Sequence, residues 1–380
     1  MVLVCALTTP QGEIAFTAGT EQENQRIHIV DVATGEARAV GQGNRDGAPV
    51  WSPDGQWLAY PSAQDGGMGI RMMKGDGTGD RALVNQHSWN HSPRWSPDSR
   101  YLCYSSDDRM GLERRLVVYD READQEEIWG GELNRMVVSA PLVGLLQPVW
   151  LAEPKLVAML DPEMEISLAG VDMDLLREEG GLSDLSVILG TMPDALLAIG
   201  LFGVPGKYST EPVLVTKTQV VPILPLMPDA PESGRYVEWG LEMNRKGDKV
   251  VFESNDGGDR EIYLLGSRGL SNISNHRAAD WNPVWGQGSQ EILFESFRHG
   301  RRGIYKVIAD TGRVTPLVIS NDYDTWAPAW RGDDQWVAYV SNESGRAGVY
   351  ICTARGEDVQ VVVAGDGMHY APAWRPEVAK

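Results

Sequence analysis

The sequence predicts an all-β protein built from repeats of about 44 residues, and two observations lead to this prediction. The motif Pro-x-Trp recurs, with its tryptophan at positions 51, 95, 285, 330 and 374, and consecutive copies within each group lie 44 or 45 residues apart. Most copies are followed shortly by an apolar run, such as Trp57–Tyr60 or Trp336–Tyr339. A fixed period in this range marks a repeat architecture, and several short strands per repeat favour a β-propeller.

One repeat, residues 51–95, reads as four short strands. The strands are expected at residues 56–61, 69–73, 81–84 and 93–95, with a tight glycine-rich turn at 74–79. Four strands with punctuating turns fit one blade of a propeller. The repeats 285–330 and 330–374 follow the same plan, and residues 14–40 match it with Leu7 at the tryptophan position.

The middle of the chain, at about 150–243, is degenerate. Pro148-Val149-Trp150 keeps the motif and is expected to lead into a strand at 155–160, whereas Met192-Pro193-Asp194-Ala195 resembles a worn copy of the following turn. The tryptophan positions then fall at 7, 51, 95, 150, 191, 243, 285 and 330, with 374 closing onto the first. This predicts eight blades. The alternative is seven blades plus an irregular insertion, which would hold the one helix-like piece at about 173–179.

We expect residues 1–380 to form a single propeller domain. The last motif, Ala371–Trp374, reads as the inner strand of a blade whose other three strands come from residues 13–40. Pairing of the two ends would close the ring and remove the open sheet edges that favour aggregation. Residues 1–7 compete for the same place or form a surplus strand.

Composition excludes several functional classes. The net charge of −19 carries no clustered basic face for nucleic acid, and we interpret the short cluster at 298–302 as a solvated loop. No apolar stretch is long enough for a membrane helix, so membrane insertion is not expected. Three cysteines give no disulfide framework. We therefore expect a soluble, monomeric, cytoplasmic protein, or a periplasmic one if a signal peptide has been removed.

The run from Phe252 to Leu264, followed by Leu270-Ser271-Asn272 and Asp280–Trp285, resembles the TolB-type propeller repeat. The resemblance covers roughly residues 13–120 and 240–374 and is specific for the fold. Residues 150–240 barely match, and no TolB-like N-terminal domain precedes the propeller, which weakens the inference of a TolB role in envelope integrity. Similar repeats also form the propellers that gate prolyl-oligopeptidase-type and tricorn-type peptidases, and those of oligogalacturonate lyase, so function needs its own argument.

A search for catalytic groups predicts no catalytic residue, no metal and no cofactor. Gly286-Gln287-Gly288-Ser289 does not fit the nucleophile elbow Gly-x-Ser-x-Gly, and no α/β-hydrolase domain follows residue 374. A metal site assembled from distant blades could draw on His91, His276 and His369, but their spacing does not support one. The stretch at 75–80 lacks the later glutamate of a calcium loop and reads as a hairpin turn.

The variable residues before each Pro-x-Trp are the best site candidates. They precede the innermost strand, so they should ring one mouth of the central channel, where the loops after each second strand also emerge. We expect the Pro-x-Trp tryptophans themselves to pack between blades. The predicted binding residues are Asp46, Asn90, His91, Asp280, Trp281, Asp324, Trp326, His369 and Tyr370.

Carboxylates, amides, imidazoles and exposed aromatics in loops favour recognition of a partner. The sequence therefore predicts a non-enzymatic scaffold or regulatory module that binds a protein or peptide through the channel mouth. The alternatives are a hydrolase or polysaccharide lyase with its site in the channel, a propeller that gates a peptidase, and a periplasmic envelope protein of the TolB sort.

Overall fold

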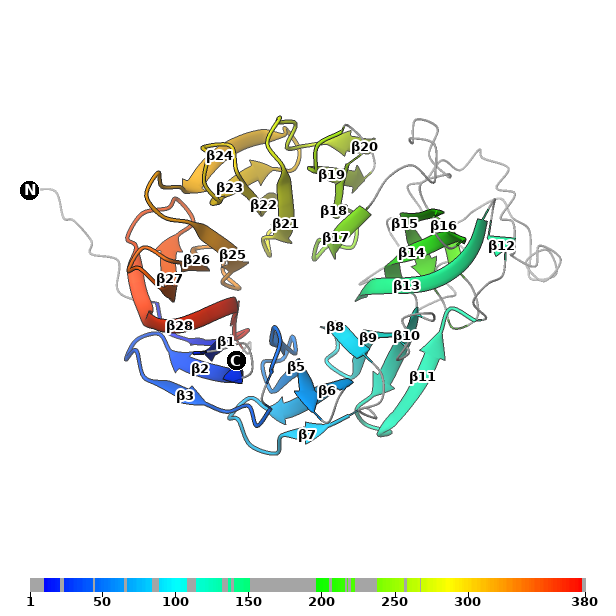
Figure 1. Cartoon of the computed structure of the whole chain (residues 1–380), viewed down its shortest axis with the longest axis horizontal. Coiled ribbons are helices and arrows are strands. Elements are labelled where there is room, and N and C mark those ends of the chain that lie inside the picture. Colours follow the sequence, from blue (N-terminus) through cyan, green and yellow to red (C-terminus); the bar gives the residue numbers. More distant parts are fainter. Residues whose placement is uncertain are drawn as a thin grey trace, which may run out of the picture.

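The computed structural model describes residues 10–377 except 21–23, 44, 65–66, 84–88, 108–113, 132–135, 138–139, 151–195, 205–206, 216, 218–219, 223–237, 256–257 and 267. Within these residues every extended regular element is a β-strand, 28 in all. The sheets are arranged radially around a common centre (Figure 1). The all-β prediction is confirmed for this part of the chain, whereas the helix-like piece at 173–179 lies outside it.

The described strands pair antiparallel into seven four-stranded units, numbered here in chain order. Unit 1 contains the C-terminal half of β28 (Gln360–Trp374) with β1 (Glu13–Gly19), β2 (Arg26–Asp31) and β3 (Ala37–Ala39). Unit 2 contains β4 (Val50–Trp51), β5 (Trp57–Gln64), β6 (Gly67–Lys74) and β7 (Arg81–Ala82). Unit 3 contains β8 (Trp89–Trp95), β9 (Tyr101–Asp107), β10 (Arg114–Asp120) and β11 (Gln125–Trp129).

The other four units follow the same order from the inner strand outwards. Unit 4 contains β13 (Ala140–Trp150), β14 (Leu196–Val204), β15 (Lys207–Val215) and β16 (Val220–Pro222), and β12 (Met136–Val137) forms a hairpin with β13. Unit 5 contains β17 (Glu238–Met243), β18 (Val250–Ser254), β19 (Glu261–Gly266) and β20 (Gly269–Asn272). Unit 6 contains β21 (Asp280–Trp285), β22 (Glu291–Ser296), β23 (Gly303–Ile308) and β24 (Arg313–Val318). Unit 7 contains β25 (Thr325–Trp330), β26 (Trp336–Ser341), β27 (Ala347–Thr353) and the N-terminal half of β28.

Unit 4 differs from the expected eight-repeat arrangement. Trp150 on β13 pairs directly with Leu196 on β14, so the expected repeats beginning at 150 and at 191 contribute to one unit rather than two. The turn expected at 192–195 lies outside the described residues, and the strand that begins at Leu196 pairs with an inner strand far earlier in the chain. The strand expected at 155–160 lies outside the described residues.

Both ends of the chain meet in the long strand β28. Its first half pairs with β27, as in Ala347↔Gly367. Its second half pairs with β1 from the other end of the chain, as in Ile14↔Trp374. The C-terminal Pro-x-Trp motif is thus the inner strand of a unit completed by residues 13–39, as the sequence predicts.

The hydrophobic core lies between neighbouring units. Ile292 and Phe294 of β22 pack in a cluster shared with unit 5, whereas Leu293 packs in a cluster shared with unit 7. Successive side chains of a strand point to opposite faces of its sheet, so a sheet covered on both sides needs an unbroken apolar run. This explains why the second strands are apolar at consecutive positions rather than alternating.

In five units the turn after the inner strand contains a left-handed residue. In the copy Ser52-Pro53-Asp54-Gly55, the Ser52 hydroxyl accepts the Trp57 N–H at 2.9 Å, and Gly55 has φ of 65°. Ser99, Gly247, Ser289 and Asp334 hold positive φ at the same place in other units. Glycine reaches this conformation without steric cost, which explains the Asp-Gly preference of the motif.

The Pro-x-Trp tryptophans at 51, 95, 285, 330 and 374 are buried, each 5–8% exposed, and pack between units as expected, whereas Trp150 is half-buried. Several also donate their indole N–H to a carbonyl of the preceding inner strand. Trp51 bonds the Ala373 carbonyl at 3.1 Å, Trp95 the Val50 carbonyl at 3.2 Å, and Trp285 the Glu242 carbonyl at 3.2 Å. The motif therefore joins each unit to its neighbour.

Candidate functional site

The loops before the inner strands and after the second strands meet on one face, called here the mouth face. Arg298, which follows β22, bonds Asp280 at the start of β21. Likewise the Nε2 atom of His91 on β8 lies 3.6 Å from an oxygen of Asp107 at the end of β9. The expectation that these two sets of loops emerge together is correct for these units.

Four of the nine predicted binding residues are buried and bonded within the protein. Asp46 accepts the Ile27 N–H at 3.1 Å and the Ser62 hydroxyl at 2.6 Å. Asn90 donates to the Met68 carbonyl at 2.9 Å, and His369 contacts the Ala347 carbonyl. Asp46, Asn90, Asp280 and His369 are at most 3% exposed. Their side chains stabilise the loops, so we correct their assignment to the binding surface.

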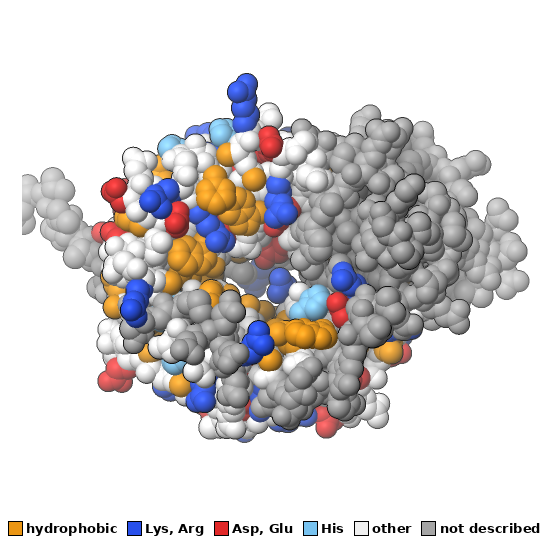
Figure 2. All heavy atoms as spheres, viewed as in Figure 1, with side chains coloured by type: hydrophobic (Ala, Val, Ile, Leu, Met, Phe, Trp, Pro, Cys, Tyr) orange, Lys and Arg blue, Asp and Glu red, His pale blue; other side chains and the backbone are white. Residues whose placement is uncertain are grey.

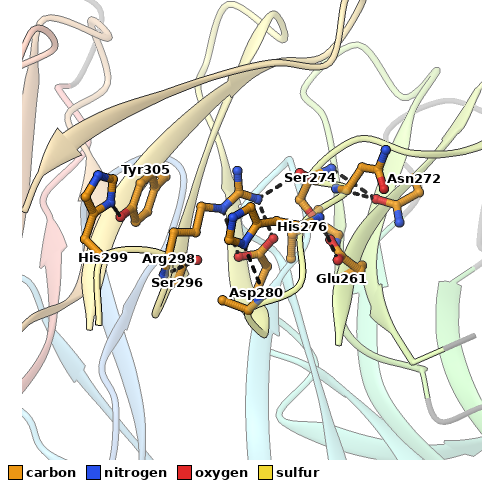
Figure 3. A network of polar contacts seen from close by, with 12 residues as sticks. Glu261, Asn272, Ser274, His276, Asp280, Ser296, Arg298, His299 and Tyr305 are labelled. Atoms are coloured by element: carbon orange, nitrogen blue, oxygen red, sulfur yellow. Dashed lines mark hydrogen bonds and ion pairs between the residues drawn. The ribbon is translucent and has the colours of Figure 1, made fainter. Parts of the chain in front are cut away.

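Asp280 belongs to a polar network that joins units 5 and 6 (Figure 3). Arg298 donates from Nη2 to Asp280 at 2.5 Å and to the Ser274 carbonyl at 2.8 Å. The Ser274 hydroxyl bonds Glu261, which also accepts the His276 N–H at 2.8 Å. Burial raises the pKa of Glu261 above its usual value. The loop at 298–302 is exposed at residues 299–301, as expected, but the Arg298 side chain is 11% exposed and has a structural role.

Glu295 is a second buried hub on this side of the channel. Its carboxylate accepts the Asn282 side-chain amide at 2.7 Å, the Ala327 N–H at 2.9 Å and the guanidinium of Arg302. Glu295 is fully buried, so these donors compensate its desolvation. The contacts tie unit 6 to the first residues of unit 7.

Arg302 lies between two indole rings. Its guanidinium carbon is 5.5 Å from the ring centre of Trp281 and 5.6 Å from that of Trp326. Phe297 packs on Trp281 with ring centres 5.0 Å apart and remains 47% exposed. Trp281, Phe297, Arg302 and Trp326 form what we call the aromatic–arginine cluster. Figure 2 shows hydrophobic side chains gathered around the central hollow, with basic side chains among them.

A second polar and aromatic group lies on unit 3. Trp89 is 47% exposed, and His91 and Arg114 both approach Asp107. Arg114 Nε lies 3.4 Å from a carboxylate oxygen of Asp107. This group offers an exposed indole beside a mixed-charge cluster, which is a suitable composition for a contact surface.

Two further predicted residues are partly buried at the rim. Asp324 accepts the Arg302 N–H at 3.2 Å and lies 3.5 Å from the Arg301 guanidinium. The Tyr370 hydroxyl accepts from the Gln25 amide at 2.9 Å, and desolvation raises the pKa of this tyrosine. Both residues keep part of their surface accessible to a partner.

Two cavities are lined by described residues of the inner strands. One, of about 400 Å³, is lined by Arg94, Glu242, Glu253, Arg260 and Asn282, among others. The other, of about 670 Å³, is lined by the tryptophans at 51, 95, 150, 330 and 374 and by Arg94. Among the residues that the structure describes, no group of three or more His, Cys, Asp or Glu side chains is arranged to hold a metal ion. In the same part of the chain no helix is long and apolar enough to cross a membrane.

Sequence reasoning missed Glu295, Arg302, Phe297, Arg94 and Glu242. The buried glutamates do have a local signal. The tripeptide Phe-Glu-Ser occurs at both 252–254 and 294–296, and its glutamate stands in the second strand where an apolar residue is expected. The position of Arg94 also carries a signal, since it is charged where most copies of Pro-x-Trp have Val or Ala. No local pattern distinguishes Phe297 as exposed.

Comparison with known proteins identifies the repeats. The family described as the TolB beta propeller domain matches residues 2–178. None of the curated proteins searched matches the sequence. Among solved structures, TolB from Acinetobacter baumannii is 15% identical with a TM-score of 0.54, covering 98% of this chain and 69% of that chain.

Two peptidase structures are similar in the same way. The β-propeller domain of the Trilobed protease from Pyrococcus furiosus is 11% identical with a TM-score of 0.60, covering 94% of this chain and 97% of that chain. Acylaminoacyl peptidase from Pyrococcus horikoshii is 11% identical with a TM-score of 0.58, covering 94% of this chain and 51% of that chain. At these identities the likeness shows the fold alone. The chain therefore has the fold of a β-propeller, and its residues 2–178 match the TolB beta propeller family.

Proposed function

We propose that this propeller is a non-enzymatic binding module that holds a protein or peptide partner on its mouth face. The observation that carries the proposal is the aromatic–arginine cluster, in which Phe297 is 47% exposed beside the stacked Trp281, Arg302 and Trp326. Tryptophan and arginine are enriched among residues that contribute most to binding energy. Because Glu295 and the two indoles hold Arg302, the cluster loses little conformational entropy when it is covered.

The partner would present an apolar or aromatic side chain to this cluster. Asp324 and Arg301 lie at its edge and supply hydrogen-bonding groups of both signs to a peptide backbone or polar side chains. Trp89 provides a second apolar contact from unit 3. A monomeric, cytoplasmic chain, with a periplasmic location as the alternative, remains our prediction.

The test uses a displayed library of random linear peptides selected on the immobilised protein. Selected peptides should lose at least about tenfold in affinity for the double variant Trp281→Ala/Phe297→Ala, because each removed aromatic contributes one kcal/mol or more at such a site. The matched control is Ile128→Ala/Val361→Ala, which removes exposed hydrophobic side chains from other strands. If no peptides are selected, or if both double variants retain them equally, the mouth-face proposal is wrong.

An enzyme with its site in the channel is the second candidate, and Glu242 is the observation in its favour. Desolvation raises the pKa of Glu242 to about 7, and the residue lines the 400 Å³ cavity. A general acid or base works best with a pKa near the operating pH. Turnover of a panel of peptides and oligosaccharides by the native protein, lost in Glu242→Gln, would favour this candidate over the binding module.

We further propose that the ring has seven blades, with residues 151–195 inserted between the first and second strands of the fourth. The direct pairing of Trp150 with Leu196 supports this arrangement. The pairing of β28 with both β27 and β1 supports closure of the ring within unit 1.

A further inference from the structure

The inner strands hold one equivalent residue of each unit at the same register. It is the middle residue of Pro-x-Trp or its counterpart, in every case paired with the second strand in the same register. We call these seven positions the waist: Val50, Arg94, Val149, Glu242, Val284, Ala329 and Ala373. Five are small and apolar, and two carry opposite charges. Arg94 and Glu242 line the same cavity of about 400 Å³.

The backbone holds both charged residues in place. The Arg94 carbonyl accepts the Trp150 indole N–H at 3.0 Å. The Glu242 carbonyl accepts the Trp285 indole N–H at 3.2 Å, and one Glu242 carboxylate oxygen accepts the Trp285 backbone N–H at 2.8 Å. Since these contacts come from the neighbouring units, the backbone that carries each of the two side chains is fixed, as a binding site requires.

The other charged groups of this cavity are already engaged. Glu253 accepts the Asn282 N–H at 2.7 Å, and its second oxygen lies 3.4 Å from Arg260. Arg94, by contrast, donates to the Pro93 carbonyl at 3.3 Å and has no carboxylate within ion-pair distance among the described residues. The cavity therefore presents one guanidinium and one carboxylate oxygen that a ligand can satisfy.

We propose that the waist binds a small zwitterion, an amino acid or short peptide with free termini, with its carboxylate on Arg94 and its ammonium on Glu242. Guanidinium groups bind carboxylates through paired, charge-assisted hydrogen bonds. Leu241, Pro283 and Val284, which also line this cavity, accommodate the apolar part of such a ligand. A volume of about 400 Å³ lies in the range of small-molecule sites. The site is separate from the mouth face, so either proposal can fail alone.

Protonation of Glu242 should make ligand binding depend on pH. Desolvation raises the pKa of Glu242 to about 7, while the Trp285 N–H and the charge of Arg94 oppose the rise. The charged groups near it are Arg94 from β8, Glu253 from β18 and Arg260 before β19. A bound ammonium group favours the carboxylate, so binding near pH 7 should release a proton. Affinity should rise from pH 6 to about 7.5, above which the ligand amine begins to lose its charge.

The experiment is calorimetric titration with three probes of similar size: triglycine, N-acetyl-triglycine and triglycinamide. The native protein should bind triglycine about tenfold more tightly than either blocked probe, because each blocked group removes one charge-assisted contact. Arg94→Gln should bind triglycine and triglycinamide equally. Glu242→Gln should bind triglycine and N-acetyl-triglycine equally and lose the proton release.

Arg245→Gln is the matched control. Arg245 lines the neighbouring 670 Å³ cavity, and we expect this variant to keep the full discrimination between the probes. Thermal unfolding of each variant checks that its fold is retained. The proposal is overturned if native protein shows no saturable binding of triglycine at tens of millimolar, or if it binds all three probes alike. Equal loss in Arg245→Gln and Arg94→Gln would also overturn it.

Discussion

Asp46 illustrates how burial changes the role of a polar loop residue. Its carboxylate is 1% exposed and is held by the Ser62 hydroxyl and the Ile27 N–H. Desolvation outweighs these hydrogen bonds and raises the pKa of Asp46 to about 6. The side chain joins the loop before β4 to units 1 and 2, and it does not face a partner.

This raised pKa predicts a pH-dependent stability. The folded protein holds the Asp46 proton up to about pH 6, whereas the unfolded chain releases it near 3.8, so ionisation lowers the free energy of unfolding between these values. Each unit of difference in pKa corresponds to about 1.36 kcal/mol, so ionisation lowers the free energy of unfolding by about 2–3 kcal/mol. In Asp46→Asn the amide oxygen can accept the Ile27 N–H while the NH2 group donates to the Ser62 hydroxyl, without ionising, so the variant should gain about this much relative to the native protein between pH 4 and 7.5.

Urea unfolding at pH 4, 5.5 and 7.5 measures the effect. The control is Asp322→Asn, whose side chain is exposed on a loop. If the free energies of unfolding of the native protein and of Asp46→Asn differ by the same amount at every pH, burial of Asp46 does not control its ionisation.

The inner strands share a local distortion before the proline. Ser92, Gly240, Asn282, Ala327 and Ala371 have φ between 46° and 61°, and the strand register shifts at this point in several units. Such a bulge turns a backbone N–H away from the hydrogen bonds that join the two strands. In two units this N–H is hydrogen-bonded by a buried glutamate of the preceding unit. Glu253 accepts the Asn282 N–H, and Glu295 accepts the Ala327 N–H.

The tryptophan that ends the inner strand allows a matched comparison. Trp285 donates its indole N–H to the Glu242 carbonyl, whereas the buried indole nitrogen of Trp330 has no hydrogen-bond partner in the described part of the chain. The two rings are 5% and 7% exposed. Replacement by Phe removes similar volume in both cases. Trp285→Phe should therefore lower the free energy of unfolding by about 1 kcal/mol more than Trp330→Phe.

Equilibrium unfolding in urea compares the two variants directly. The slope with denaturant should be the same for both, which shows that the same transition is measured. If both variants lose the same free energy of unfolding, the tryptophans stabilise the protein through packing between units and not through the indole hydrogen bond.

The seven-blade arrangement of the chain predicts that residues 151–195 are dispensable for folding. Trp150 and Leu196 are cross-strand partners, so an Asn-Gly hairpin turn can join them. The shortened protein should keep its far-UV circular dichroism per residue and unfold cooperatively. The matched control removes residues 286–330, which deletes an equal length of chain but takes out the second to fourth strands of one unit and the inner strand of the next.

Limited proteolysis and thermal unfolding distinguish the outcomes. The control deletion should abolish cooperative unfolding, because it exposes the apolar faces of units 5 and 7. Eight blades would make both deletions equally damaging.

The repeat, the strands and the adjacency of the mouth-face loops follow from local patterns. Turn residues such as Pro53-Asp54-Gly55 and short apolar runs specify strands within about ten residues of chain, and the tryptophan period places them in successive units. The meeting of residues 13–39 with Ala371–Trp374 was also predictable, because an inner strand without followers needs partners. Exposure of the site residues was not predictable, since Asp280 and Asp324 both lie within four residues before a Pro-x-Trp motif and yet differ in burial.

Sequence alone thus determines the β-strand content, the TolB-like repeat and the chain ends that share a unit, because each depends on turn chemistry and strand alternation within a short window. Tertiary structure decides that Trp150 pairs with Leu196, that Arg302 is enclosed by two indoles, and that Arg94 and Glu242 line one cavity. These features depend on packing between segments far apart in the chain. Desolvation and ion pairing there are set by neighbours that no local pattern specifies.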